Sequence, residues 1–386
     1  MNAPRQMKLV FVTGSLVHGG AERHSITLAN RLAERGHECH AVYIKDIPDQ
    51  LGRLRLSAPS SVRCLHARRY FDVSALSHLH AFLARLEPSV VFATNSYALM
   101  YASLARVRAP LAVALHTTYL QTLKEKAQML AYRPLYWSAA AAVFVCERQR
   151  AHWARRAVFA RRSAVIYNGV DLEHWQGDPF AGDAVRRAAG FEPGDFVVGL
   201  SAVLRPEKNP VQLVEAVARL RNRGVRATAL FIGDGPQRSP VLERAALLGI
   251  PDHVVVTGFQ QDVRPYVSAC DVLALTSFTE ALSLAAIEAM ALGRPVVHPD
   301  VGGARELITH GEDGLLFPVG DTDALVSALQ RLSERAVRRE MGRRARGTVE
   351  ARFSEHAMVE RYEALLAEIA SPRRKHGHLR KRAAAH

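Results

Sequence analysis

Short apolar runs alternate with amphipathic segments along most of the chain, the pattern typical of a parallel α/β protein. Glycine and polar turn residues bound the apolar runs, as expected for buried strands. The first series of expected strands is at residues 8–13, 38–44, 89–93, 111–115, 140–146 and 164–167. The second series is at residues 196–200, 228–232, 253–257, 271–275 and 295–298.

Two such series predict two doubly wound domains facing each other across a deep cleft. We place the N-terminal domain at 1–176 and the C-terminal domain at 195–354. Residues 177–194 are rich in Gly, Pro and Asp and are interpreted as an interdomain linker. Residues 355–370 form an amphipathic pattern expected to be a final helix. The basic tail at 371–386 is expected to be disordered.

Two glutamates near the fourth strand of the second series are the strongest chemical signal. Glu280 falls in the loop after that strand, and Glu288 falls within the helix that follows. Ser283 is a candidate N-cap for this helix, whose first N–H groups and dipole favour an anion. The backbone donors belong to Leu282, Ser283 and Leu284. A ligand with a central phosphate and hydroxyl groups on either side, such as a nucleotide sugar, suits this arrangement.

Downstream residues strengthen this interpretation. They include Gly293-Arg294-Pro295-Val296-Val297, then Val301-Gly302-Gly303-Ala304-Arg305-Glu306, then Gly314-Leu315-Leu316-Phe317. The whole block resembles the C-terminal domain of the retaining glycosyltransferases of family 4, which have the GT-B fold. This resemblance implies two Rossmann-like domains, an N-terminal one for the acceptor and a C-terminal one for the sugar donor. It also implies that the last helix crosses back onto the N-terminal domain.

The resemblance assigns roles to residues of the C-terminal domain. Glu280 is expected to bind hydroxyls of the donor sugar, and Glu288 those of the ribose. Lys208 matches a family lysine that contacts the donor diphosphate. Val203 stands where the family most often has an arginine, so Arg205 is the candidate for that second cation. Gly258 and Phe259 match a turn that meets the nucleobase.

The N-terminal domain carries two further matches. Gly19 and Gly20 resemble the family's glycine loop under the donor phosphates, where glycine permits close approach of the backbone. His116 ends a strand at the cleft mouth, a position where the family places a histidine near the donor sugar. Glu280 and His116 are therefore the candidate catalytic residues.

Composition agrees with a globular protein rather than a disordered or fibrous one. The 386 residues are 48% hydrophobic and 23% charged, and the longest apolar stretch is too short to span a bilayer. No signal peptide is evident, so a cytoplasmic location is expected. Four cysteines without paired spacing favour a reducing compartment.

Neither a cofactor nor a metal is expected. The Gly233-Asp234-Gly235 turn lacks the third glycine of a dinucleotide loop, which argues against nicotinamide. There is no Asp-x-Asp motif and no histidine cluster with the spacing of metal ligands.

The net charge of +14 is partly concentrated in the tail and in residues 148–162, where Trp153 and Phe159 interleave with arginines. An anionic membrane surface is the expected partner, with a solvated basic face as the alternative. Nucleic acid is not expected, because basicity is the only feature that favours it.

The sequence therefore predicts a retaining, metal-independent hexosyltransferase that moves a sugar from a nucleoside diphosphate, UDP favoured over GDP, to a glycan or lipid-linked acceptor. Such an enzyme would serve cell-surface polysaccharide or glycolipid synthesis. Two alternatives stay open. An epimerase of the same fold would turn over the donor without an acceptor. A non-catalytic nucleotide-sugar-binding protein would follow if Val203 marks a degenerate site.

Overall fold

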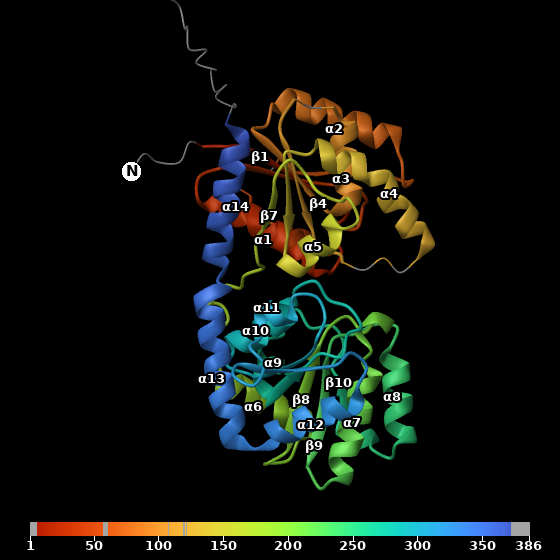
Figure 1. Ribbon diagram of the computed structural model, residues 1–386, viewed down its shortest axis with the longest axis vertical. Helices are drawn as coiled ribbons and strands as arrows, with labels where there is room; N and C mark the ends of the chain where they lie inside the picture. Colours follow the sequence, from red (N-terminus) through yellow and green to blue (C-terminus); the bar gives the residue numbers. More distant parts are fainter. Residues whose placement is uncertain (1–5, 57–60, 107, 119, 121, 372–386) are drawn as a thin grey trace, which may run out of the picture.

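The computed structural model describes residues 6–56, 61–106, 108–118, 120 and 122–371 of the chain. It contains two sheets, and every strand pair in them is parallel. Figure 1 shows the two sheets in separate domains, one above the other. The predicted GT-B architecture is confirmed.

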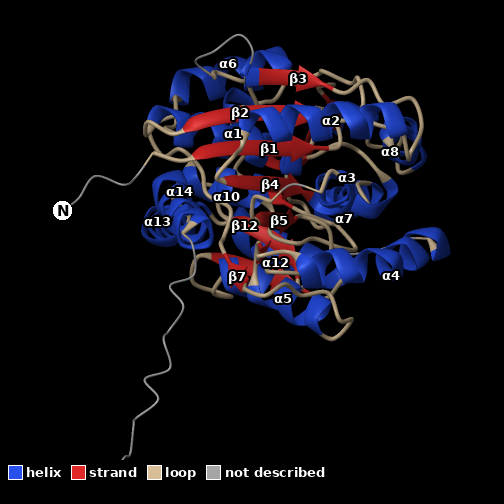
Figure 2. Cartoon of the chain, turned by 90° about the horizontal axis from the view of Figure 1, so that it is seen from above, coloured by secondary structure: helices blue, strands red, loops and turns tan. Residues whose placement is uncertain are grey.

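The N-terminal domain is built on a seven-stranded sheet with the order β3-β2-β1-β4-β5-β6-β7, which Figure 2 shows from above. Its strands are β1 (Lys8–Thr13), β2 (Glu38–Tyr43), β3 (Val62–Cys64), β4 (Val90–Thr94), β5 (Leu111–Leu115), β6 (Ala141–Phe144) and β7 (Ser163–Val165). Its helices are α1 (Gly20–Glu34), α2 (Val73–Leu86), α3 (Asn95–Leu104), α4 (Leu123–Ser138) and α5 (Glu147–Ala154).

The C-terminal domain is built on a six-stranded sheet with the order β10-β9-β8-β11-β12-β13. Its strands are β8 (Phe196–Ser201), β9 (Ala227–Ile232), β10 (Val254–Val256), β11 (Val272–Ala274), β12 (Val296–Pro299) and β13 (Gly314–Phe317). The remaining helices are α6 (Pro179–Ala188), α7 (Val211–Asn222), α8 (Arg238–Leu247), α9 (Arg264–Ala269), α10 (Leu284–Ala291), α11 (Ala304–Leu307), α12 (Thr322–Ser333), α13 (Arg335–Arg352) and α14 (Glu355–Ala370).

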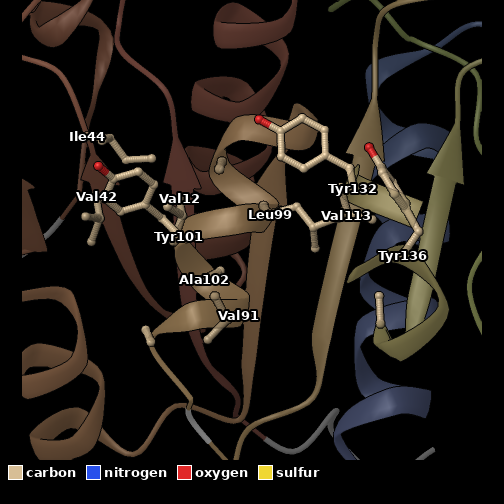
Figure 3. Close-up of a cluster of buried hydrophobic side chains, with 14 of the residues drawn as sticks. Val12, Val42, Ile44, Val91, Leu99, Tyr101, Ala102, Val113, Tyr132 and Tyr136 are labelled. Atoms are coloured by element: carbon tan, nitrogen blue, oxygen red, sulfur yellow. The ribbon is translucent and has the colours of Figure 1, made fainter. Parts of the chain in front are cut away.

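Side chains alternate between the two faces of a sheet along each strand, and apolar side chains form a core on both faces. In β1, Val10 and Val12 pack on one face with α2, α3 and α4, and part of this cluster is drawn in Figure 3. Leu9 and Phe11 point to the other face and pack with α1 and α14. Because both faces are buried, the strands read as continuous apolar runs.

The segment predicted as a linker is largely helical. Residues 177–194 contain α6, which begins after an Asp178 N-cap whose side chain accepts hydrogen bonds from the N–H groups of Phe180 and Ala181. Gly182 lies so close to the backbone of Ser268 that a Cβ would be 2.9 Å from it. Arg186 also donates to the carbonyl of Ala269. The segment is therefore a packed part of the C-terminal domain, although its composition resembles that of a turn-rich linker.

The C-terminal helices cross from one domain to the other, as predicted. Figure 1 shows α13 beside the C-terminal domain and α14 beside the N-terminal domain, along one side of the molecule. The chain between them lies against Gly169 and Val170: the N–H of Val170 donates to Phe353 and the N–H of Glu355 donates to Val170. A Cβ on Gly169 would be 2.5 Å from the carbonyl oxygen of Ser354, so glycine is required there.

Helix α14 is held on the N-terminal domain by apolar packing and ion pairs. Tyr362 is fully buried in the same core as Phe92 of β4. Arg31 of α1 pairs with Glu355, and Arg35 pairs with Glu363 at 2.6 Å. The predicted basic tail, apart from Ser371, lies outside the described residues. None of the helices described is long and apolar enough to cross a membrane.

Candidate active site between the two domains

A cavity of about 510 Å³ lies between the carboxyl ends of the two sheets. Loops that follow β1, β5, β8 and β11 supply most of its wall, as expected for doubly wound domains. The predicted site residues that line it are Gly19, Gly20, His116, Arg205, Lys208, Glu280, Leu282, Ser283 and Leu284. Gly258, Phe259 and Glu288 are not part of its lining. Segments far apart in the sequence are therefore brought to one site.

The start of α10 offers backbone donors to this cavity. Ser283 is the N-cap, and its hydroxyl accepts a hydrogen bond from the N–H of Ala286 at 3.3 Å. This confirms the expected cap. Leu282, Ser283 and Leu284 line the cavity beside the cap, where the unpaired N–H groups and the helix dipole favour negative charge.

Two glycines shape the loop that carries Glu280. Gly302 has a φ of +53°, and a Cβ there would be 2.0 Å from the carbonyl oxygen of Glu280. Gly303 donates its N–H to the carbonyl of Ala281 at 2.6 Å. The Gly-Gly pair lets the backbone after β12 lie directly against the Glu280 loop, which a larger residue would prevent.

Glu280 is buried as a charged group. Its carboxylate accepts hydrogen bonds from Lys208 Nζ at 2.6 Å and from Ser277 Oγ at 2.8 Å. Burial pushes the pKa of Glu280 upward, but the Lys208 ammonium, nearby His298 and the Ser277 hydroxyl outweigh it. The pKa is therefore lowered, and Glu280 remains an anionic acceptor for hydroxyl groups at neutral pH.

The two candidate phosphate-binding cations differ in their surroundings. Lys208 is fixed by Glu280, whereas the side chain of Arg205 is 55% exposed and its guanidinium lies 3.9 Å from Glu207. Val203, which stands at the usual arginine position, also lines the cavity and is 41% exposed. Arg205 therefore reaches the cavity from a different position in the same loop.

Glu288 faces the other domain rather than the cavity. It is 4% exposed, and its carboxylate pairs with Arg23 of α1. Burial raises the pKa of Glu288, while Arg23 and the more distant Arg53 oppose the rise. The expectation that both glutamates line one site thus holds only for Glu280 in this structure. Glu288 instead forms an ion pair between the domains.

His116 lies at the cavity wall with a second histidine behind it. The ring of His24, from α1, is centred 4.6 Å from the His116 ring and 5.2 Å from that of Tyr362. Burial lowers the pKa of His116 to about 4. The pKa of His24 is also lowered well below its usual value, mainly by burial and further by the charge of His116. Both histidines are neutral at pH 7.

The backbone of His116 is held by Asn95. Asn95 has a φ of +66°, a left-handed conformation that asparagine tolerates better than most residues. Its Oδ1 accepts the N–H of His116 at 3.0 Å. Asn95 also lines the cavity, so it links the start of α3 to the end of β5.

The proposed nucleobase turn lies at the surface. Gly258 has a φ of +74° and forms an isolated bridge with Gly233. Phe259 is 57% exposed, and its ring is centred 4.5 Å from that of His18 in the opposite domain. These contacts place the turn beside the glycine loop. Its role with a nucleobase stays a prediction.

Within the described residues, one group of three metal-capable side chains lies close together: Asp46, Cys64 and His66. It lies at the carboxyl ends of β2 and β3, at the outer edge of the N-terminal sheet, and none of the three residues lines the cavity between the domains.

Comparison with known proteins agrees with this geometry. Residues 195–335 match the family described as glycosyl transferases group 1, and residues 18–174 match that described as glycosyltransferase family 4. Together the two matches cover most of both domains. The chain belongs to glycosyltransferase family 4.

Curated relatives align with different shares of the chain. It is 35% identical to the N-acetyl-alpha-D-glucosaminyl L-malate synthase of Bacillus anthracis over 166 residues, and these residues make up 43% of each protein. It is 24% identical over 309 residues to the UDP-Gal:alpha-D-GlcNAc-diphosphoundecaprenol alpha-1,3-galactosyltransferase of Escherichia coli, 77% of this chain and 80% of that protein. The chain spans about half the length of the first three curated relatives it matches.

Solved structures share the whole fold. Anabaena Alr3699/HepE in complex with UDP has a TM-score of 0.81 at 22% identity, covering 94% of this chain and 100% of that one. Sucrose-phosphate synthase from Thermosynechococcus elongatus has a TM-score of 0.77 at 21% identity, over 94% and 99% of the two chains.

Three polar residues of this family 4 protein received no role in the sequence analysis. Glu22 of the Gly19-Gly20-Ala21-Glu22 loop lines the cavity, and burial raises its pKa. Arg23, the next residue, holds Glu288. Both follow a glycine pair at a helix start, and this was the signal that could have drawn attention to them.

Glu306 is the third. It ends the Gly-Gly-x-x-Glu motif, and its carboxylate accepts the N–H groups of Glu147 and Arg148, each at 2.8 Å. It also accepts the hydroxyl of Tyr167 at 3.1 Å. The motif therefore caps a helix of the N-terminal domain with a side chain of the C-terminal domain.

We predict that the stability of the protein falls as the pH is lowered from about 6.5 through about 4, partly because of His24 and His116. Their pKa values are depressed in the folded state. The unfolded state thus binds more protons in this range, and their contribution is complete only above the unfolded pKa. Denaturant unfolding at several pH values measures this loss.

Replacing His24 with Phe should flatten that pH dependence and preserve stability at pH 7. Both ring nitrogens of His24 lack a hydrogen-bond partner among the described residues, and an apolar ring removes that cost. His78→Phe on the exposed face of α2 is the control and should keep the wild-type slope. An unchanged slope in His24→Phe would contradict the assignment.

Proposed function

We propose that this protein transfers a hexosyl unit from a nucleoside diphosphate sugar, with UDP favoured over GDP, to a hydroxyl of a glycan or lipid-linked acceptor. The observation that carries the proposal is the Lys208–Glu280 ion pair beside the start of α10 in the interdomain cavity. It places a hydroxyl-binding carboxylate next to a cation and a row of N–H donors. A sugar diphosphate needs both kinds of group.

Relatives support the choice of donor. The Anabaena structures contain UDP and UDP-glucose, and the name of the Escherichia coli relative includes a UDP-galactose donor and a lipid diphosphate acceptor. In this chain, Arg205, Lys208 and the N–H groups after Glu280 would stabilise the negative charge that develops on the departing diphosphate.

We infer that transfer retains the anomeric configuration. The bond from the anomeric carbon to the diphosphate oxygen breaks, and a bond to the acceptor oxygen forms on the same face. The acceptor proton passes to the leaving phosphate oxygen. The positive charge of the oxocarbenium-like transition state is stabilised by the anionic Glu280 and the departing diphosphate. Neutral His116 can accept or donate one hydrogen bond to the sugar without adding a charge.

We expect Glu280→Gln to lower turnover about tenfold or more, since a hydrogen bond to a charged group is worth roughly 1.5–3 kcal/mol. Glu288→Gln should weaken UDP binding by a similar factor if the ribose takes the place of Arg23 at this carboxylate. Calorimetry with UDP and release of UDP from donor sugars measure the two effects. Glu243→Ala, on the exposed face of α8, is the control and should match wild type. Wild-type binding and rates in both variants would refute these roles. Conversion of the donor into an isomeric sugar, with no product formed on an acceptor, would favour an epimerase.

Activity should persist in excess EDTA. Arg205, Lys208 and the start of α10 supply the positive charge that a divalent cation would otherwise provide at the leaving group. The rate of UDP release before and after chelation tests this. A loss of activity that magnesium or manganese restores would overturn metal independence.

We infer further that the N-terminal domain binds an anionic membrane surface through Phe159, as expected, but with Trp137 rather than Trp153 beside it. Trp153 is fully buried and donates to the carbonyl of Thr117, so it cannot contribute to a membrane contact as expected. Phe159 is 46% exposed and stacks on Trp137, which is 45% exposed. Leu130 and Leu123 lie one and two heptads before Trp137 on α4 and are also exposed.

Positively charged side chains accompany the exposed apolar side chains of Leu123, Leu130, Trp137 and Phe159. Arg155, Arg156 and Arg161 are exposed and have no carboxylate partner among the described residues, unlike Arg162, which pairs with Glu368. Aromatic side chains and unpaired arginines together suit an interfacial contact.

Co-sedimentation with liposomes should therefore require anionic lipid and decline with added salt. Arg155→Glu/Arg156→Glu/Arg161→Glu should abolish the salt-sensitive part, and Trp137→Ser/Phe159→Ser should weaken binding at every salt concentration. The control is Arg187→Glu/Arg335→Glu/Arg339→Glu, which makes the same charge change on the C-terminal domain. Equal recovery of wild type with neutral and anionic liposomes at low salt would contradict the inference.

A further inference from the structure

A second hollow of about 540 Å³ opens from the N-terminal domain beside the interdomain cavity. The two share Asn95, Thr117, Arg205 and Glu207 in their linings. Asn95 is the residue that holds the backbone of His116. A ligand in the second hollow would therefore meet a ligand of the first at the side where His116 lies.

Tyrosine rings dominate the wall of this hollow. Tyr70, Tyr97 and Tyr132 line it together with Leu115, Leu120 and Met129. The rings of Tyr70 and Tyr97 are centred 4.8 Å apart, and the hydroxyl of Tyr70 contacts that of Tyr132. Together the rings form an extended aromatic surface contributed by α3, α4 and the segment before α2. Figure 3 shows Tyr132 projecting from α4.

Neighbouring residues hold these rings in place. Tyr101 packs edge-on against Tyr97 with ring centres 5.3 Å apart. Its hydroxyl accepts the N–H of Asp72 and donates to the carbonyl of Tyr70. Lys45 Nζ lies 5.5 Å above the Tyr97 ring. The aromatic surface is thus fixed before any ligand arrives, which lowers the entropy cost of binding.

The hollow carries no excess of positive charge. Its charged lining residues are Glu125, Glu207 and Arg205. Glu125 belongs to the capping box of α4, where its side chain accepts the N–H of Thr122, and Arg205 lies 3.9 Å from Glu207. The other polar groups are the neutral side chains of Asn95, Ser96, Thr117 and Gln128. An anionic group would gain little here, whereas neutral hydroxyls would find hydrogen-bond partners.

We propose that this hollow binds an uncharged sugar ring at the end of the acceptor, with the apolar face of the ring on the tyrosines and its hydroxyls toward the amide and hydroxyl side chains. The assignment rests on the proposed transferase function and adds the class of acceptor. Any phosphate or lipid anchor of that acceptor lies outside the hollow. The accepting hydroxyl points to the seam formed by Asn95 and Thr117, beside the donor cavity.

Binding of methyl glycosides in the presence of UDP tests the proposal. Saturation-transfer NMR should detect neutral methyl glucoside, galactoside or N-acetylglucosaminide, and should show weaker or no transfer to methyl glucuronide and glucose 6-phosphate. Preference for the charged sugars, or binding of none of the five, would overturn it.

A second test measures the acceptor KM with the neutral glycoside that binds best. Tyr97→Ala and Tyr132→Ala should raise the acceptor KM roughly tenfold or more, since a buried aromatic contact is worth about that factor. Tyr97→Phe and Tyr132→Phe should retain most of the affinity, because the ring face is kept. Phe180→Ala, on exposed α6, is the control. Unchanged KM in both alanine variants would refute the site.

UDP binding and donor hydrolysis distinguish failure of this acceptor-site proposal from failure of the proposed transferase function. The alanine variants should bind UDP and hydrolyse donor sugar as wild type does. If wild type neither binds UDP nor consumes donor, the proposed function fails. If it does both while the tyrosine variants keep their acceptor KM, only the acceptor site fails. Equal loss of UDP binding in the variants would show a structural role and would also overturn the assignment.

Discussion

The structure of the interdomain cavity depends on keeping one buried carboxylate charged. A glutamate as enclosed as Glu280 would take up a proton if burial acted alone, because a charge removed from water loses most of its hydration. Lys208 and Ser277 prevent this, and they come from the loops after β8 and β11. The two loops must therefore meet at Glu280. Gly302 and Gly303 let a third loop pack against the loop that carries Glu280. The three loops that meet at the charged Glu280 carboxylate therefore form much of the cavity wall.

The same dependence extends across the domain boundary. Glu288 and Arg23 form an ion pair between α10 and α1, and Glu306 caps α5 from the opposite domain. Breaking one partner of a buried pair leaves the other charge without compensation, which costs far more than an exposed pair gains. These contacts, together with α14, favour one relative position of the domains. If Glu288 binds the donor ribose as proposed, the ribose has to displace Arg23, and donor binding would then be linked to the contact between the domains.

Sequence patterns were sufficient where a local rule determines the structure. Apolar runs located every described strand except β3 and β13, which were not predicted. Ser283 was recognisable as a cap because its chemistry is local. Patterns failed where the partner lies far away in the chain. Trp153 sits among arginines and looks exposed, yet β6 and the Thr117 carbonyl enclose it. Residues 177–194 have the composition of a linker, but contacts with Ser268 and Ala269 stabilise a helix there.

The spacing of Glu280 and Glu288 predicted their helix and loop correctly but not the direction in which each carboxylate points, since Arg23 lies 265 residues away in sequence. The tyrosine-lined hollow could not be predicted for the same reason. Tyr70, Tyr97 and Tyr132 share no periodicity, and only the fold brings them together. Their surface differs in kind from that of the interdomain cavity beside it, where Lys208, Arg205 and a helix start would suit the diphosphate of the proposed donor. If they bind donor and acceptor as proposed, two adjoining hollows that differ in charge would hold the two substrates without exchanging them. A diphosphate gains nothing among the tyrosines, and a sugar without a diphosphate gains nothing from the cations and the helix start of the interdomain cavity.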